Sequence, residues 1–269
     1  MTIKNSEEIE LIKSSCNLVS LTLALLGQYI APGITTQRLD SIAEEFIRDH
    51  GAIPAFKNYK PDKDHVPYPC TICTSINEEV VHGIPSAKVV LKEGDIVSID
   101  CGVVWKGYYG DAAYTFAVGE IDSQKEKLLQ VTLQALYVGI SCAKEGARIG
   151  DVSSAIQQHV ENHGFSVVRE MMGHGIGKNL HEPPEIPNFG KRGCGMVLQA
   201  GMILAIEPMV NMGRPAIKKK KDGWTIVALD SLPSAHYEHT ILVTKDKAQI
   251  LTNFDYIQTY YGKTIFDTC

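Results

Sequence analysis

Three features are scarce or missing in this sequence of 269 residues, and each absence excludes a class of protein. No run of about 18 consecutive apolar residues occurs, so no segment is expected to span a membrane. Basic residues are not in excess, because 26 Lys and Arg stand against 31 Asp and Glu, whereas nucleic-acid-binding proteins are usually basic. The seven cysteines are an odd number, so they cannot all pair in disulfides, and a chain of this length can fold without disulfides. Free thiols and a cytoplasmic location are therefore expected.

Several sequence signals of catalysis and metal binding are also missing. No G-x-S-x-G motif is present, which argues against a serine hydrolase. Cys70 and Cys73 form a single C-x-x-C pair without a second pair at zinc-ribbon spacing, so no structural zinc ion is expected. The glycine-rich stretch 173–178 is not a phosphate-binding loop, because Met172 stands where glycine is required and Asn179 where Ser or Thr is required.

The chain does contain an internal repeat of predicted elements. In each half, two amphipathic helices come first, and the second helix ends at a His-Gly pair, His50-Gly51 or His163-Gly164. A glycine turn and a short apolar strand follow in each half, and the strand ends at a carboxylate, Asp100 in the first half and Glu207 in the second. Repetition in the same order indicates two structurally related halves.

This pattern predicts one domain of the α+β class. Residues 1–269 are expected to form a single catalytic domain, with an N-terminal half of about 1–120 and a C-terminal half of about 121–269. Helix pairs should pack on one face of a curved, largely antiparallel sheet.

Two of the carboxylates lie in a predicted hairpin. Asp100 belongs to the apolar strand 96–104 and Asp111 to the strand-like run 109–118, with a turn at 105–108. If the turn centres near residues 105 and 106, the two acids lie opposite each other, with Cβ atoms about 4.5–5.5 Å apart. Like charges in that position are destabilising unless something positive lies between them.

Further candidate ligands follow in the C-terminal half. Glu207 and Glu238 lie in two more apolar strands, and His174 is flanked by glycines. Any one of these acids is equally often a structural ion pair, but a carboxylate in an apolar strand is costly to bury unpaired. The four negative charges with His174 match two divalent ions, so the set predicts a dinuclear hydrolytic centre. His82 and His181 lie in predicted loops and are candidate oxyanion stabilisers or proton shuttles, although each alone is more often a surface histidine.

With its five candidate ligands in this order, the chain resembles the methionine aminopeptidases of the pita-bread metallopeptidase family. It is similar to the short bacterial type I form across essentially its whole length. The 31 positions from Glu207 to Glu238 leave no room for the helical insert of the type II form. The most specific matches are Ser75-Ile-Asn-Glu78, His82-Gly-Ile-Pro85, Gly173-His-Gly-Ile-Gly177 with His181, Ile206-Glu-Pro-Met-Val-Asn211, Asp222-Gly-Trp224 and Tyr237-Glu-His-Thr240.

The resemblance implies a fold, an activity and a role for each site residue. The expected fold is the pita-bread fold, and the expected reaction is removal of the N-terminal methionine from nascent polypeptides whose second residue is small. Glu207 is implied as general base toward a metal-bridging water. The implied metal ligands are Asp100 on one metal, His174 on the other, Asp111 and Glu238 as bridges, and Glu207. His82 and His181 are implied to contact substrate and stabilise the tetrahedral intermediate, and the implied methionine pocket is lined by Tyr59, Tyr68, Cys73 and Trp224.

The implied cofactors are two divalent ions, Co²⁺, Mn²⁺, Fe²⁺ or Zn²⁺, among which this donor set does not choose. A monomer is usual for the family. The chain departs from the family pattern at Phe56, where some members have cysteine, at Leu180, where an aromatic residue is frequent, and at a short insertion, Lys60–Val66, near the pocket mouth.

Alternatives remain open for function and for one charged run. A prolidase or Xaa-Pro aminopeptidase of the same fold is the runner-up, although those enzymes usually carry an extra N-terminal domain. A catalytically dead binding module of this fold is a third reading, but such modules lose metal ligands. The basic run is either a solvated loop or a contact to the polyanionic ribosome; it consists of Lys218, Lys219, Lys220 and Lys221.

Overall fold

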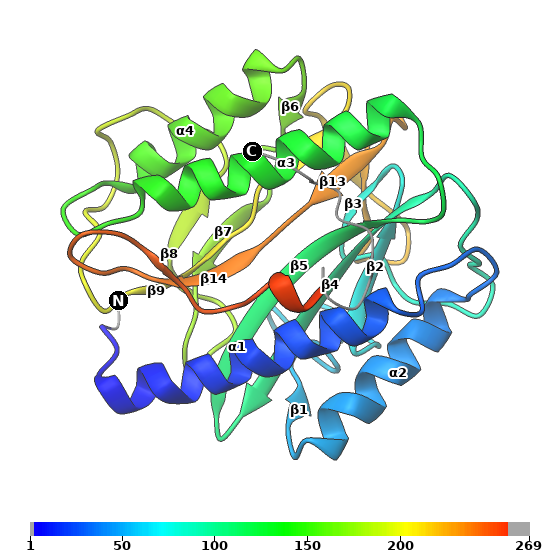
Figure 1. Ribbon diagram of the computed structural model, residues 1–269, viewed down its shortest axis with the longest axis horizontal. Coiled ribbons are helices and arrows are strands. Elements are labelled where there is room, and N and C mark those ends of the chain that lie inside the picture. Colours follow the sequence, from blue (N-terminus) through cyan, green and yellow to red (C-terminus); the bar gives the residue numbers. More distant parts are fainter. Residues whose placement is uncertain (1–2, 258–269) are drawn as a thin grey trace.

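The computed structural model of the protein describes residues 3–257 (Figure 1). Four helices lie in this part of the chain: α1 (Ser6–Gly27), α2 (Thr36–Asp49), α3 (Ser123–Cys142) and α4 (Ile149–Asn162). The strands are β1 (Ile53–Pro54), β2 (Ile72–Ile76), β3 (Glu79–Val81), β4 (Ile96–Trp105), β5 (Tyr108–Ala117), β6 (Ser166–Val167), β7 (Met172–Gly175), β8 (Glu182–Pro187), β9 (Ile203–Ile206), β10 (Met209–Asn211), β11 (Ile217–Lys219), β12 (Ile226–Ala228), β13 (Ser234–His236), β14 (His239–Leu242) and β15 (Gln249–Ile250).

Helix α1 covers the long hairpin of β4 and β5. Its apolar residues Ile12, Cys16, Val19 and Leu23 recur every three or four positions and are fully buried. By length and composition this helix also qualifies as a membrane-spanning candidate, although charged and polar residues interrupt its apolar sequence. In the structure half of its most apolar stretch is buried inside the protein, as expected for a core helix.

The strands form four hydrogen-bonded sheets, and every strand pair in residues 3–257 is antiparallel. Strand β4 pairs with β1, β2 and β5, and the largest sheet has the order β15-β14-β9-β7-β8. Helices α1 and α2 pack on the β4 sheet, whereas α3 and α4 pack beside β10, β13 and β8 (Figure 1). The predicted α+β class, with helix pairs over antiparallel strands, is confirmed; the boundary between the halves stays a prediction.

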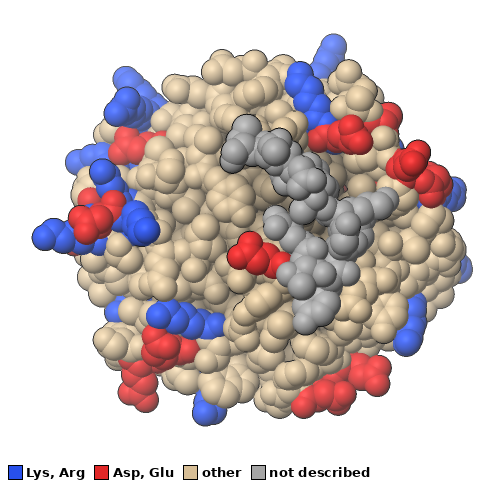
Figure 2. Space-filling model, in the orientation of Figure 1, with Lys and Arg blue, Asp and Glu red and all other residues tan. Residues whose placement is uncertain are grey.

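Charged side chains do not gather by sign on the face drawn in Figure 2. On the part of this face that the structure describes, basic and acidic groups lie near one another around the edge, and uncharged residues fill most of the centre. This mixture agrees with the formal net charge of −5 and with the absence of a basic excess.

The hairpin that carries Asp100 and Asp111 has a different register from the predicted one. Its two-residue turn is Lys106-Gly107, with φ of 49° and 80°, the backbone of a tight hairpin turn. The turn centre therefore lies one position later than predicted, and Asp100 pairs with Ala113 instead of Asp111. Because the offset is two residues, both acids still project from the same face, as diagonal neighbours.

Candidate metal centre

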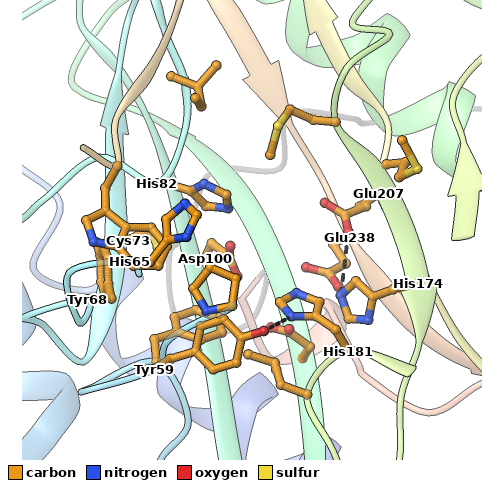
Figure 3. A pocket seen from close by; sticks show the side chains of 18 of the residues that line it. Tyr59, His65, Tyr68, Cys73, His82, Asp100, His174, His181, Glu207 and Glu238 are labelled. Carbon is orange, nitrogen blue, oxygen red and sulfur yellow. Dashed lines mark hydrogen bonds and ion pairs between the residues drawn. The ribbon is translucent and has the colours of Figure 1, made fainter. Parts of the chain in front are cut away.

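All five predicted ligands border one cavity of about 280 Å³, and Figure 3 labels four of them, Asp100, His174, Glu207 and Glu238. They reach it from separate parts of the chain: Asp100 from β4, Asp111 from β5, His174 from β7, Glu207 directly after β9, and Glu238 between β13 and β14. The β4 sheet and the five-stranded sheet thus border the same cavity. The cavity lies where the N-terminal hairpin meets the C-terminal strands, so neither half holds the site alone.

The sequence pattern predicted Glu238 inside a strand, but this prediction is wrong, because the residue lies between β13 and β14. Strand β13 pairs with β10, whereas β14 pairs with β9. Tyr237 and Glu238 form the junction between β13 and β14, where the chain passes from one sheet to the other. The Glu238 backbone N–H donates to the Ala113 carbonyl at 2.9 Å, so β5 holds this junction in place. The side chain is 1% exposed.

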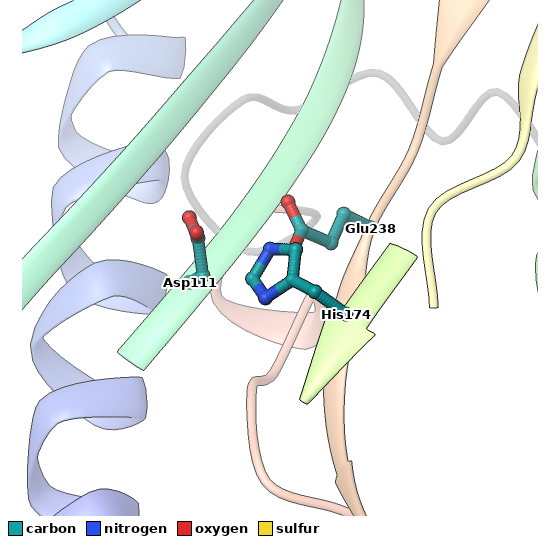
Figure 4. A group of neighbouring side chains, drawn as sticks. All are labelled: Asp111, His174 and Glu238. Atoms are coloured by element: carbon teal, nitrogen blue, oxygen red, sulfur yellow. The ribbon is translucent and has the colours of Figure 1, made fainter. Parts of the chain in front are cut away.

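Three of the ligands already form a compact donor group. One donor atom from each of Asp111, His174 and Glu238 lies within 4.8 Å of the other two (Figure 4). Glu207 lies beside this group, with its Oε1 atom 3.6 Å from His174 Nε2. Oxygen donors with one imidazole are the ligands that Mn²⁺, Fe²⁺, Co²⁺ and Zn²⁺ accept.

The buried polar atoms of this group fit a cation. Asp100 Oδ1, Asp111 Oδ1 and Glu238 Oε1 are buried and have no hydrogen-bond partner in the described part of the chain. Buried carboxylate oxygens are rarely left without partners, because desolvation without compensation is costly. Divalent ions would supply the missing interactions, so the residues present fit a metal centre.

Burial sets the protonation of the cluster. It raises the pKa of Asp100 to about 7 and that of Glu207 to about 8. The pKa values of Asp111 and Glu238 are raised well above their usual range, first by burial and then by the neighbouring carboxylates. Burial lowers the pKa of His174 to about 3, so its imidazole is neutral at pH 7, as metal ligation requires.

The two predicted loop histidines both reach the cavity. His181 lies at the rim, where the Tyr59 hydroxyl is hydrogen-bonded to its Nδ1 atom at 2.5 Å (Figure 3). Its ring also meets that of His174, with centroids 4.3 Å apart. His82 directly follows β3 with a φ of 59°, and burial lowers its pKa to about 4. Both imidazoles are therefore neutral at pH 7, because burial lowers the pKa of His181 as well.

One neighbour of the cluster, His236, was missed by the sequence analysis. It is 1% exposed, and its Nε2 atom lies 3.3 Å from Glu207 Oε2. Neither ring nitrogen makes a hydrogen bond within the described residues. His236 precedes Glu238 by two positions, and residues two apart in an extended chain share a face. That spacing is the signal from which it could have been found.

Comparison with known proteins agrees with this geometry. The model of metallopeptidase family M24 matches residues 10–245. The chain belongs to this family. A methionine aminopeptidase of Clostridium acetobutylicum is 48% identical over 250 residues, which cover 93% of this chain and 98% of the relative. The crystal structure of a methionine aminopeptidase from Thermotoga maritima superimposes with a TM-score of 0.91 at 46% identity, covering 94% of this chain and 99% of that one.

Within the M24 family, the chain groups with the type I methionine aminopeptidases and has their pita-bread fold, as predicted. The prolidase from Pyrococcus furiosus is a more distant neighbour, with a TM-score of 0.73 and 24% identity; this chain covers 65% of it. At that identity the likeness shows the fold alone. The alternative hypothesis, a prolidase or Xaa-Pro aminopeptidase, therefore has only distant support.

The predicted pocket residues of this M24 peptidase line the same cavity. Tyr68, Cys73 and Trp224 are buried in one apolar cluster, and Tyr59 packs against it. Two of the three departures from the family pattern belong there too, because Phe56 and Leu180 are 7% and 3% exposed and line the cavity. Apolar and sulfur-containing walls suit a thioether side chain.

A buried ion pair ties the N-terminal segment to the loop of His181. Lys4 Nζ lies 2.6 Å from Glu182 Oε2, with side chains 2% and 10% exposed. The Glu182 carboxylate also accepts hydrogen bonds from the backbone N–H groups of Lys178 and Asn179. These contacts close the turn that ends at His181.

Proposed function

We propose that this M24 peptidase removes the N-terminal methionine from nascent polypeptides whose second residue is small. The observation that carries the proposal is the shared cavity, in which the five predicted metal ligands adjoin an apolar pocket of Tyr68, Cys73 and Trp224. The high identity to methionine aminopeptidases over nearly the whole chain supports it.

We infer that two divalent ions are held by Asp100, Asp111, His174, Glu207 and Glu238, and that Mn²⁺, Co²⁺, Fe²⁺ and Zn²⁺ are the candidates. The donor group and its unpartnered oxygens support this assignment. Such ions polarise a carbonyl group and lower the pKa of water when they are bound.

The chain's own residues then divide the proton transfers. Glu207 would take a proton from the attacking water and pass it to the leaving amine, as a general base and acid. When the Tyr59 hydroxyl donates to Nδ1 of His181, the neutral imidazole carries its proton on Nε2. This N–H would stabilise the oxyanion of the tetrahedral intermediate, with His82 as a second substrate contact.

Release of free methionine from a Met-Ala-Ser peptide tests the proposal directly. A Gly-Pro dipeptide in a parallel assay separates it from prolidase activity. We expect methionine release from the tripeptide and at least tenfold slower hydrolysis of the dipeptide. Hydrolysis of Gly-Pro alone would favour the runner-up, and hydrolysis of neither substrate with metal bound would favour a binding module.

The second substrate residue should be restricted by size. His82 and His181 project into the cavity between the pocket and the ligands, so a bulky second side chain is expected to clash with them. We expect kcat/KM to fall by at least about 10²-fold from Met-Ala to Met-Leu peptides, with Met-Val between them. Equal kcat/KM values for the three would refute the crowding argument.

Contact with the ribosome is a further part of the proposal. The basic run is not the free loop that was expected, because Lys218 and Lys219 lie in β11 and Lys220 forms an ion pair with Glu79. Lys219 also lines the cavity. All four lysines are exposed, but Lys218 and Lys221 neither line the cavity nor form an ion pair within the described residues. They are therefore the residues that would meet ribosomal RNA, attracted over a Debye length of about 8–10 Å.

The test replaces Lys218 and Lys221 by alanine and uses Lys88→Ala with Lys92→Ala, two other exposed lysines, as a charge-matched control. Salt-sensitive co-sedimentation with ribosomes should weaken at least threefold in the first variant only, while peptide turnover stays unchanged in both. Equal co-sedimentation of both variants would leave the run as a solvated surface.

We also infer a cytoplasmic monomer. The six cysteines in the described residues are free thiols, which suits a reducing compartment. Sedimentation velocity and cell fractionation would test the two inferences separately.

A further inference from the structure

The segment Lys60–Val66, which we call the strap, leaves the body of the protein and returns to the same point. At its base the Asn58 N–H donates to the Tyr68 carbonyl at 2.8 Å, and the Tyr68 N–H donates to the Tyr59 carbonyl at 2.9 Å. The chain on either side of the strap is thus already joined by hydrogen bonds. The strap is therefore not needed to connect its neighbours.

Within the strap, one residue turns inward. Lys60, Pro61, Asp62, Lys63 and Asp64 are exposed, whereas His65 is half-buried. Asp62 Oδ1 accepts hydrogen bonds from the backbone N–H groups of Asp64 and His65 and lies 2.8 Å from His65 Nδ1. This local turn presents the His65 ring to the cavity, which His65 and Pro61 both line.

The strap holds Trp224. The indole N–H of Trp224 donates to the Val66 carbonyl at 3.0 Å, and the His65 ring lies 6.2 Å from the Trp224 ring, centroid to centroid. Trp224 in turn meets Tyr68 and His82 edge to face, at centroid distances of 5.2 and 6.0 Å. A buried indole N–H requires an acceptor, so the strap carbonyl fixes the orientation of the ring that these side chains share.

We propose that the strap is a specificity-determining wall of the first-residue pocket. It closes the solvent side of the pocket with Pro61 and His65, and it positions Trp224 through the Val66 carbonyl. The inference rests on the proposed function for the identity of the first residue, methionine. Figure 3 shows His65 and Tyr68 on the far side of the cavity from Glu207 and His174. The pocket beside the strap therefore receives the side chain of the first substrate residue.

The strap can be removed without changing net charge. It contains two lysines and two aspartates, and replacing residues 60–67 by Asn-Gly leaves Tyr59 and Tyr68 three positions apart. That is the spacing of the hydrogen bond across a two-residue hairpin turn, which Asn-Gly favours. Because the excision leaves the net charge unchanged, long-range electrostatic effects are excluded as an explanation of altered substrate binding.

The experiment compares this excised variant with His65→Ala, which keeps the Val66 carbonyl, and with Lys63→Ala, an exposed strap residue, as control. In the excised variant we expect KM for Met-Ala-Ser to rise about tenfold with kcat within threefold, because one wall of the pocket is lost. The preference for Met-Ala-Ser over norleucine-Ala-Ser and Leu-Ala-Ser, as a ratio of kcat/KM, should fall about tenfold. His65→Ala should show a smaller change of the same sign, and Lys63→Ala none.

Tryptophan emission gives a readout that does not depend on peptidase activity. The chain has two tryptophans, so in a Trp105→Phe background only Trp224 emits. Trp224 is 9% exposed, and excision should shift its emission to the red. Unchanged emission together with KM and preference within twofold of the parent would overturn the proposal.

Two outcomes are kept apart by this design. If the excised variant does not fold, as judged by circular dichroism, the His65→Ala preference decides, and an unchanged preference there overturns the wall. If the parent releases no methionine, the proposed function fails, while the emission shift still tests whether the strap holds Trp224.

Discussion

Replacing Glu207 by glutamine is expected to lower kcat for methionine release by at least about 10²-fold, the lower end of a general-base contribution. The side chain lies between two imidazoles, 3.6 Å from His174 and 3.3 Å from His236, at the edge of the donor group. Glutamine keeps the shape of glutamate but cannot accept the proton of water. Steady-state kinetics on Met-Ala-Ser, with circular dichroism to verify folding, measure the effect.

A matched control is Glu185→Gln. Glu185 pairs in register with His174 across β7 and β8, but its side chain is exposed. This variant should keep kcat within twofold of the parent. A loss of less than threefold in Glu207→Gln would show that Glu207 is not the base.

Chelation is expected to abolish activity, and added Mn²⁺ or Co²⁺ should restore it. Four carboxylates and one imidazole around one cavity are expected to bind two divalent ions, the second ion more weakly than the first. Because ions that bind only the folded chain stabilise it, the unfolding temperature should fall on chelation. Elemental analysis, turnover and calorimetry on the same samples test this, and full activity in verified metal-free protein would contradict it.

The metal affinity should also depend on pH in a defined direction. Without a cation, burial raises the pKa of Asp100 to about 7 and that of Glu207 to about 8. Both groups therefore hold protons below those values and must release them when a metal binds. Apparent affinity for Mn²⁺ should fall as the pH decreases from 8 to 6, which isothermal titration calorimetry at several pH values would measure.

Local patterns predicted much of the fold. The apolar periodicity of α1 and the His-Gly ends of α2 and α4 depend on residues close in sequence, and the structure has helices at these places. The hairpin of Asp100 and Asp111 was also predicted, but with its turn centred one position too early. Lys106 and Gly107 both have positive φ values and form a two-residue turn. The position of this turn sets the register of β4 against β5.

The metal centre was predictable in its members but not in its arrangement. Asp100, Asp111, His174, Glu207 and Glu238 were chosen from residue type, strand context and order, and the structure places all five at one cavity. Their roles as ligands stay predictions until metal is measured. The break of the strand at Glu238 was not predicted, because it depends on the exchange of one partner strand for another.

By itself, the sequence determined the fold class, the family and the set of chemically active side chains, because these depend on residue identity and on local spacing. Only the tertiary structure decided that His236 adjoins Glu207, that Lys220 is paired, and that the strap holds Trp224. Val66 and Trp224 are 158 positions apart, and no local pattern relates them. Their contact exists because the packing of the whole chain brings a carbonyl to a buried indole N–H that needs an acceptor.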